Sequence, residues 1–179
     1  IQTGQVYGAI RGKRFDGHQF IPRAVEIGAG GLVVGRDISQ FDLPDDLPVT
    51  RVQDCILYLA AEAQKRIKQL NTTRIAVTGS VGKTTTRNAI ATVLSEVAPV
   101  ITPEGNLNTL LGLSLTILNN LEEEGQLFGH EVGAYQRGDI AHVCRYFPPD
   151  LAVVTNVHPV HLEHMGSMEN ILLAKQELV

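Results

Sequence analysis

The sequence predicts an α/β protein with a small mixed α/β domain at its amino-terminal end, followed by a mostly parallel sheet with helices on both faces. Three observations predict this fold class. Short apolar, β-branched runs alternate with longer segments of helical periodicity along most of the chain. A Gly-rich turn at residues 79–82 follows one such run and opens a helical segment. The polar stretch 71–73 marks a boundary, because a new strand starts directly after it.

The first predicted domain covers residues 1–70. Its strands are predicted at residues 6–10, 31–34 and 49–52. Its helices are predicted at residues 21–27 and 55–70. Asp54 can cap the second helix through its carboxylate. The apolar residues of that helix keep to one face, as a helix on a core requires: Ile56, Leu59, Ala60, Ala63 and Ile67.

The second predicted domain covers residues 71–179. Its strands are predicted at residues 74–78, 99–103, 127–132 and 151–157. Its helices are predicted directly after residue 82, at 110–121, at 139–147 and from about 168. Strands that alternate with helices indicate a parallel sheet, and such sheets bind ligands at the carboxyl ends of their strands.

Composition narrows the function classes. A net charge of -4 and a pI near 5.8 argue against general binding to nucleic acid or to a membrane surface. The sequence has no apolar run near the ~20 residues that a bilayer crossing needs, so no membrane insertion is expected. Cys55 and Cys144 match no metal-ligand or redox spacing, which favours a reducing, cytoplasmic setting.

The stretch VTGSVGKTTT, residues 77–86, carries the main chemical signal. Amides of a tight Gly-rich turn at the amino end of a helix point toward an anion, as in a P-loop. The Lys83 ammonium would lie near the terminal phosphates of a nucleotide, and the Thr84 hydroxyl would reach Mg²⁺. The standard pattern has glycine where this chain has Val77, so a chance turn stays open, although the strand and helix around it favour nucleotide binding. The predicted ATP-binding residues are Gly79, Ser80, Val81, Gly82, Lys83, Thr84 and Thr85.

Polar side chains also follow the later strands. Glu131 ends one strand, where its carboxylate could bind Mg²⁺. Three histidines at three-residue spacing, His158, His161 and His164, suggest zinc, but Pro159 interrupts any helix that would align them. A single histidine near Mg²⁺ is the favoured interpretation. By its residue type and position alone, Lys175 is a surface lysine.

Six stretches resemble the Mur ligases in the same order along the chain. They are GKRFDGHQFI, AVEIGAGGLVV, VTGSVGKTTT, GNLNTLLGL, EVGAYQRGDIAHV and TNVHPVHLEHMGSMENILLAKQEL. The non-glycine Val77 is then this family's own form of the P-loop. The resemblance implies an ATP-dependent ligase that phosphorylates a substrate carboxylate to an acyl phosphate, which an amine then attacks. Such chemistry needs Mg²⁺ and a fixed, in-line geometry.

The resemblance also implies residue roles. Lys83 would contact the β and γ phosphates, Thr84 and Glu131 would bind a first Mg²⁺, and His161 with Glu131 would bind a second. Lys175 matches the lysine that CO₂ carbamylates in this family, which gives it a carboxylate-like group near the second metal. The implied catalytic residues are therefore Lys83, Glu131, His161 and Lys175.

The substrate implied by the resemblance is a UDP-N-acetylmuramoyl-peptide. Asn106, Asn108 and Thr109 match a stretch that meets this substrate, and residues 1–70 match the domain that holds its UDP end. Within the family, the motifs favour the ligase of peptidoglycan precursor synthesis that adds D-Ala-D-Ala to the tripeptide form. Leu110 and Ser114 depart from the family pattern, which usually has an acidic residue and often a proline there.

Family members continue beyond the position of Val179 into the rest of the ATPase domain and a third domain for the incoming amine. We therefore expect residues 71–179 to form a partial ATP-binding domain, the isolated chain to be inactive, and an exposed sheet edge to favour self-association. Three alternatives stay open: a noncatalytic nucleotide-binding or scaffold module, a ligase of an earlier muramoyl-peptide step, and a relative such as a folylpolyglutamate or cyanophycin synthetase. An unrelated α/β domain would need several accidental motif matches.

Overall fold

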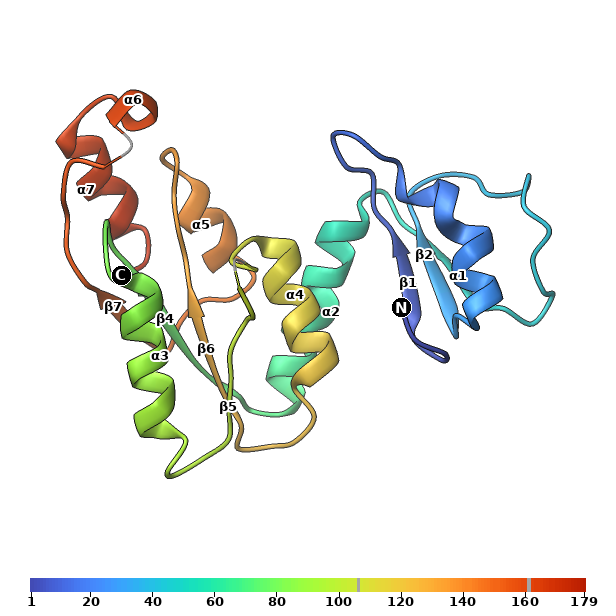
Figure 1. The fold of residues 1–179 in the computed structure, drawn as a ribbon, viewed down its shortest axis with the longest axis horizontal. Coiled ribbons are helices and arrows are strands. Elements are labelled where there is room, and N and C mark those ends of the chain that lie inside the picture. Colours follow the sequence, from blue (N-terminus) through green and yellow to red (C-terminus); the bar gives the residue numbers. More distant parts are fainter. Residues whose placement is uncertain (106, 161) are drawn as a thin grey trace. The chain divides into compact units, whose positions relative to one another are not determined.

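The computed structural model describes residues 1–105, 107–160 and 162–179 (Figure 1). The chain forms two compact units, Ile1–Leu59 and Ala60–Val179. The division falls inside helix α2 (Cys55–Gln69), whereas the sequence places the domain boundary after that helix. The assignment of residues 1–70 and 71–179 to two functional domains stays a prediction.

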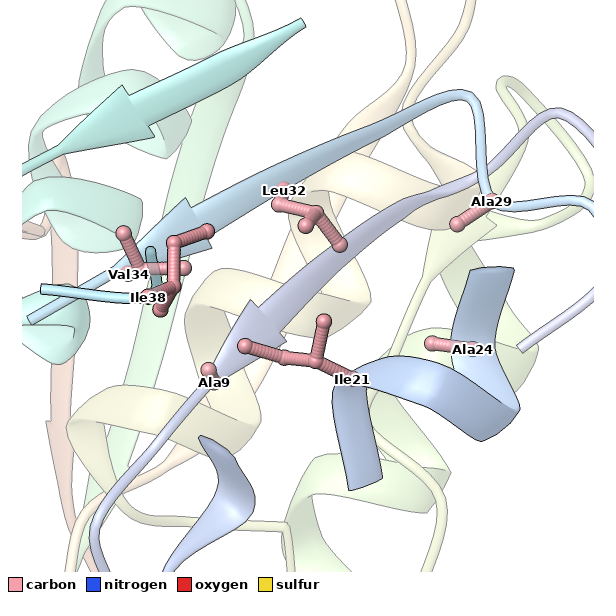
Figure 2. Packing of buried hydrophobic residues seen from close by; sticks show 7 residues of the cluster. All are labelled: Ala9, Ile21, Ala24, Ala29, Leu32, Val34 and Ile38. Atoms are coloured by element: carbon pink, nitrogen blue, oxygen red, sulfur yellow. The ribbon is translucent and has the colours of Figure 1, made fainter. Parts of the chain in front are cut away.

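The first unit is built on a three-stranded parallel sheet. Its order is β1-β2-β3, with strands at Val6–Ala9, Gly31–Val34 and Val49–Arg51. All four residues of the central strand β2 are buried. A short 3₁₀ helix η1 (Gly17–Phe20), which the sequence did not predict, leads into α1 (Ile21–Ile27). Figure 2 shows the core between α1 and the sheet: Ala9, Ile21, Ala24, Ala29, Leu32, Val34 and Ile38.

Local sequence signals explain where the first helices begin and end. Helix α1 has Pro22 in its first turn and ends at Gly28, whose φ of 92° is the left-handed conformation that favours glycine. The Asp54 carboxylate accepts hydrogen bonds from the amides of Ile56 (2.7 Å) and Leu57 (3.0 Å). The predicted cap of α2 is therefore confirmed.

The second unit is a four-stranded parallel sheet of order β5-β6-β4-β7, so the predicted fold class is confirmed. Its strands are β4 (Thr73–Thr78), β5 (Val100–Ile101), β6 (Leu127–Glu131) and β7 (Leu151–Val154). In Figure 1, α3 lies on one side of this sheet, with α4 and α5 on the other. The helices are α3 (Lys83–Leu94), α4 (Leu110–Asn120), α5 (Asp139–Cys144), α6 (Leu162–Met165) and α7 (Met168–Gln176).

Several elements differ from the prediction for physical reasons. Strand β5 has two residues rather than five, since Pro99 and Pro103 flank it and cannot donate ladder hydrogen bonds. Strand β7 ends at Val154, because the residues after it turn to contact the Gly-rich loop. Helix α5 ends at Cys144 rather than at residue 147, and the four-residue helix α6 was not predicted.

Strand β7 lies at one edge of the described sheet. Its apolar residues Leu151 and Val154 are 57% and 40% exposed. An unpaired strand with exposed apolar side chains can associate with another chain, so self-association stays a prediction. None of the helices in the described part of the chain has the length and apolarity that a bilayer crossing requires.

His130 on β6 is the least expected residue of the second core. Its ring is fully buried and stacks on Phe128 at 5.0 Å between centroids, and neither ring nitrogen has a hydrogen-bond partner among the described residues. Burial, reinforced by the charge of Arg74, lowers the pKa of His130 from 6.5 to about 3. In the folded protein this imidazole is therefore neutral at pH values well above 3.

The free energy of unfolding should fall as the pH decreases below about 6.5. The unfolded chain then binds a proton at His130 while the folded chain does not, so stability is fully present above pH 6.5 and is lost toward pH 3. The loss is at most about 1.4 kcal/mol per pH unit. Urea unfolding between pH 7 and pH 5, roughly the window above carboxylate titration, measures it.

His130→Leu should abolish most of this slope, since it removes the proton site and keeps an apolar side chain. His158→Gln is the control, because His158 is exposed. An unchanged slope in His130→Leu would show that another group causes the pH dependence.

Candidate functional site

The Gly-rich loop lies at the carboxyl end of the central strand β4. Val77 is fully buried in that strand, where it pairs with Glu131 of β6 and Val153 of β7. This explains why the chain has no glycine there: the residue still belongs to the sheet, and the turn begins only at Gly79. The turn ends at Gly82, which directly precedes α3.

Both glycines are required by the backbone. Gly79 has a φ of 148° and Gly82 a φ of 84°, which side chains rarely allow. A Cβ at Gly79 would in addition collide with the hydroxyl of Thr155, which follows β7. Gly79 therefore lets the loop approach the end of the neighbouring strand.

Residues 155–158 hold the loop in place. The side-chain amide of Asn156 makes two bonds to Val81, accepting from its N–H (3.0 Å) and donating to its carbonyl (3.1 Å). The backbone carbonyl of Asn156 accepts from the Ser80 amide at 3.1 Å. Thr155 donates to the Val81 carbonyl at 2.7 Å, and the Ser80 hydroxyl donates to the His158 carbonyl at 2.9 Å. The loop is thus fixed before any ligand arrives.

The loop and α3 together form an anion-binding geometry. Gly82 caps the twelve-residue helix α3, and no described side chain caps it by a hydrogen bond, so the first amides of the helix keep their N–H groups available as donors. The positive end of the helix dipole lies at the same place. The Lys83 ammonium donates to the carbonyls of Gly79 (2.9 Å) and Ser80 (3.3 Å), which places its charge over the loop.

Thr84 and Glu131 are adjacent at this site. The Thr84 hydroxyl donates to the Glu131 carboxylate at 2.7 Å. Glu131 is the last residue of β6 and is only 6% exposed. A hydroxyl and a carboxylate are oxygen ligands of the kind that Mg²⁺ prefers, so these two residues fit that ion.

Lys175 is buried rather than exposed. It lies on α7 and is only 4% exposed. Burial lowers the pKa of its ammonium, the charge of Lys83 lowers it further, and the charge of Glu177 opposes this shift. The interpretation of Lys175 as a surface lysine, which its residue type alone suggests, is therefore wrong.

One cavity of about 680 Å³ brings several of the predicted residues together, although Glu131 does not line it. It is lined by Gly79, Ser80 and Lys83 from the loop and α3, and by Lys175 from α7. Asn108 and Thr109 also line it, and Thr109 caps α4 by accepting from the Gly112 amide at 3.2 Å. The predicted loop residues that do not line it are Val81, Gly82, Thr84 and Thr85.

Two predicted residues, Asn106 and His161, lie outside the described residues. Within residues 1–105, 107–160 and 162–179, no three His, Cys, Asp or Glu side chains form a metal-binding group. Leu110, where an acidic residue was expected from the resemblance, is buried at the start of α4.

Sequence reasoning missed several residues that shape the site. Asn156 and Thr155 follow a parallel strand, a position where polar side chains often serve a site, and this signal could have identified them. Arg87 is buried on α3 and donates to the carbonyl of Pro103 at 2.8 Å, ahead of the Asn108 stretch. Glu177, which directly follows α7, had no sequence signal, because its partners are far away in the chain.

The order of these features along the chain agrees with a known family. The sequence matches the family described as Mur ligase middle domain over residues 77–179. The chain belongs to the Mur ligase family. The resemblance predicted from the sequence is thereby confirmed.

Alignments with individual Mur ligases extend over all or nearly all of this chain. The chain is 35% identical over 179 residues to the UDP-N-acetylmuramoyl-tripeptide–D-alanyl-D-alanine ligase of Bacillus subtilis. That alignment covers 100% of this chain and 38% of the Bacillus subtilis protein. The Escherichia coli ligase of the same name is 35% identical over 178 residues, covering 99% of this chain and 38% of its own length. The crystal structure of MurF ligase from Thermotoga maritima in complex with ADP has a TM-score of 0.88 and 38% identity, over 100% of this chain and 40% of that one.

Replacing Asn156 should loosen the Mur ligase loop. Asn156→Ala removes both side-chain bonds to Val81, and we expect the free energy of unfolding to fall by about 1–3 kcal/mol. Urea unfolding measures the change. Asn119→Ala on the exposed face of α4 is the matched control and should stay within about 0.5 kcal/mol of the wild type. Equal stability of the two variants would contradict the conclusion that Asn156 holds the loop in place.

Proposed function

We propose that this chain forms the phosphate-binding part of an ATP-dependent amide ligase of peptidoglycan precursor synthesis. The reaction would add D-Ala-D-Ala to UDP-N-acetylmuramoyl-tripeptide through an acyl phosphate. The observation that carries this proposal is the cavity in which the Gly-rich loop, Lys83 and Lys175 meet. Family membership and the names of the relatives support this proposal. The chain spans only 38% of the length of those two relatives.

The loop would bind the β and γ phosphates of ATP. The free amides at the start of α3 would donate to phosphate oxygens, as in other P-loops. The Lys83 ammonium would exchange the carbonyls of Gly79 and Ser80 for the phosphates, which are stronger acceptors. Because Asn156 already fixes the loop, little ordering is needed on binding.

Thr84 and Glu131 would hold Mg²⁺, with His161 as a further ligand of a second ion together with Glu131. The bound ion would neutralise charge on the transferring phosphoryl group. The Glu131 carboxylate would then bind the metal ion in place of the Thr84 hydroxyl proton. Because Glu131 is buried, water would compete less for its oxygens.

Carbamylation of Lys175 would resolve a charge conflict. Two ammonium groups, those of Lys83 and Lys175, line one cavity, and the charge of Lys83 helps to lower the pKa of Lys175. The lowered pKa of Lys175 increases the share of neutral amine, whose nitrogen can form a bond to the carbon of CO₂ and then lose a proton. The resulting carbamate is negative, so repulsion between the two side chains becomes attraction.

Asn108 and Thr109 would contact the muramoyl peptide, with Asn106 as a further predicted contact. They line the same cavity as Lys83, which would bring the substrate carboxylate near the γ phosphate. Holding both reactants in one cavity is the main way in which such a ligase can lower the barrier.

The first unit would bind the UDP end of the substrate in a cavity of its own, of about 370 Å³. Arg11, Asp16, His18 and Arg36 are among the residues that line it. His18 joins two sides of the cavity, since its ring accepts from the Gly35 amide at 3.0 Å and bonds the Asp16 carboxylate at 2.6 Å. Two arginines at one cavity suit a diphosphate.

Calorimetric titration with UDP tests this cavity. Arg36→Ala should weaken UDP binding about tenfold, because it removes a charge-assisted hydrogen-bond donor. Arg23→Ala on the exposed face of α1 is the control. Equal UDP affinity of the two variants would rule out the cavity as the UDP site.

Lys83→Ala tests the ATP site. Loss of a charged phosphate contact should weaken binding of Mg-ADP about 30-fold or more in calorimetry, corresponding to about 2 kcal/mol. The control is Lys68→Ala, which replaces an exposed lysine on α2 and should bind Mg-ADP as the wild type does. Nucleotide binding that survives Lys83→Ala unchanged would overturn the proposed site.

The amine donor is tested in the complete ligase, where phosphate release should depend on D-Ala-D-Ala and not on a single amino acid.

A further inference from the structure

Glu177 makes a contact between two parts of the cavity wall that are far apart in sequence. Its carboxylate accepts hydrogen bonds from the amides of Gly138 (2.7 Å) and Ala141 (3.0 Å), 39 and 36 residues away. These amides belong to the cap and first turn of α5. Each carboxylate oxygen takes one amide, so the end of α7 is bound at two points to the beginning of α5.

The segment that Glu177 holds is one wall of the cavity. Residues 133–139 all line the cavity. Asp139 accepts from the amides of Tyr135 (2.9 Å) and Gln136 (3.1 Å), which fixes the first half of this turn. Glu177 fixes its second half through Gly138. Two carboxylates therefore hold this wall: Asp139 belongs to α5 itself, and Glu177 comes from the end of α7.

Helix α7 presents Lys175 to the same cavity. Ser167 caps its beginning by accepting from the Asn170 amide at 3.1 Å, and its end is held by Glu177. Lys175 lies two residues before Glu177, on the last turn of the helix. A shift of this last turn would move the lysine nitrogen relative to Lys83, whereas the cap at Ser167 is two turns away.

We propose that Glu177 is the positioning residue that keeps Lys175 buried and aimed into the cavity, by binding the end of α7 to the wall at Gly138 and Ala141. This inference rests on the proposed function of Lys175. Glu177 acts on the lysine through the backbone, because its two carboxylate oxygens accept from the backbone amides of Gly138 and Ala141. Its charge on its own would favour the ammonium form of Lys175, which is the opposite of what carbamylation needs.

Amine labelling tests the inference directly on this chain. Labelling of lysines with a small acylating reagent, read by peptide mass spectrometry, reports how accessible Lys175 is relative to exposed lysines such as Lys65 and Lys68 in the same sample. Glu177→Ala should raise the relative labelling rate of Lys175 about tenfold, since both anchoring bonds are lost. Glu177→Gln keeps one acceptor oxygen and should give an intermediate rate.

Glu169→Gln is the matched control, because Glu169 is an exposed glutamate on the same helix. It should label as the wild type does. The second readout is the carbamate signal of Lys175 in carbon NMR with ¹³C-labelled bicarbonate, which should decrease in the order wild type, Glu177→Gln, Glu177→Ala. A purely structural role would lower the melting temperature of Glu177→Ala and leave the labelling ratio of the folded protein unchanged.

The outcomes separate the inference from the proposed function. Unchanged Lys175 labelling in folded Glu177→Ala overturns the inference, whatever the carbamate signal shows. A wild-type protein without any carbamate signal overturns the proposed modification of Lys175, while increased labelling in Glu177→Ala would still support the positioning role. Equal labelling in Glu177→Gln and Glu177→Ala would show that the charge, and not the hydrogen-bond geometry, is what matters, and would also overturn the inference.

Discussion

The close approach of the Gly-rich loop to the end of β7 is the constraint on which the site depends. Gly79 meets Thr155 where no Cβ would fit, and this proximity allows Asn156 to bind Val81 with both ends of its side-chain amide. A short glycine-rich turn would otherwise lose much conformational entropy on ordering. Here the neighbouring strand supplies the bonds that offset this cost, so the amides of α3 point at one place in the free protein.

The parallel sheet then decides which chemistry surrounds the loop. Carboxyl ends of β4, β6 and β7 meet at one edge, and they carry the loop, Glu131 and the Asn156 segment respectively. Three cations line the cavity, those of Lys83, Arg137 and Lys175, together with the carboxylate of Asp139, and the buried carboxylate of Glu131 lies beside the loop. An excess of positive charge, together with the helix dipole, would favour a polyphosphate, and under the proposed function Glu131 and Thr84 would supply oxygen ligands for the accompanying ion.

Much of this arrangement could be predicted from the sequence, because local signals carried it. The strand before Gly79 and the cap at Asp54 are short-range patterns, and both were predicted correctly. The burial of Lys175 could not be predicted from local signals. It depends on tertiary packing and on Glu177, whose hydrogen-bond partners lie 36 and 39 residues away in the chain. The same holds for the ring of His130, which has no hydrogen-bond partner in the part of the chain that the structure describes and so departs from the rule that buried polar groups find one.

The most direct test of the central claim is a titration of the isotope-labelled chain with Mg-ADP, followed by backbone amide NMR. A preformed phosphate site predicts that the largest shift changes fall on residues 79–85 and on Asn156, with little change elsewhere in the sheet. Changes confined to other regions, or the absence of binding by a folded chain, would contradict the claim that this loop is ready to bind phosphate.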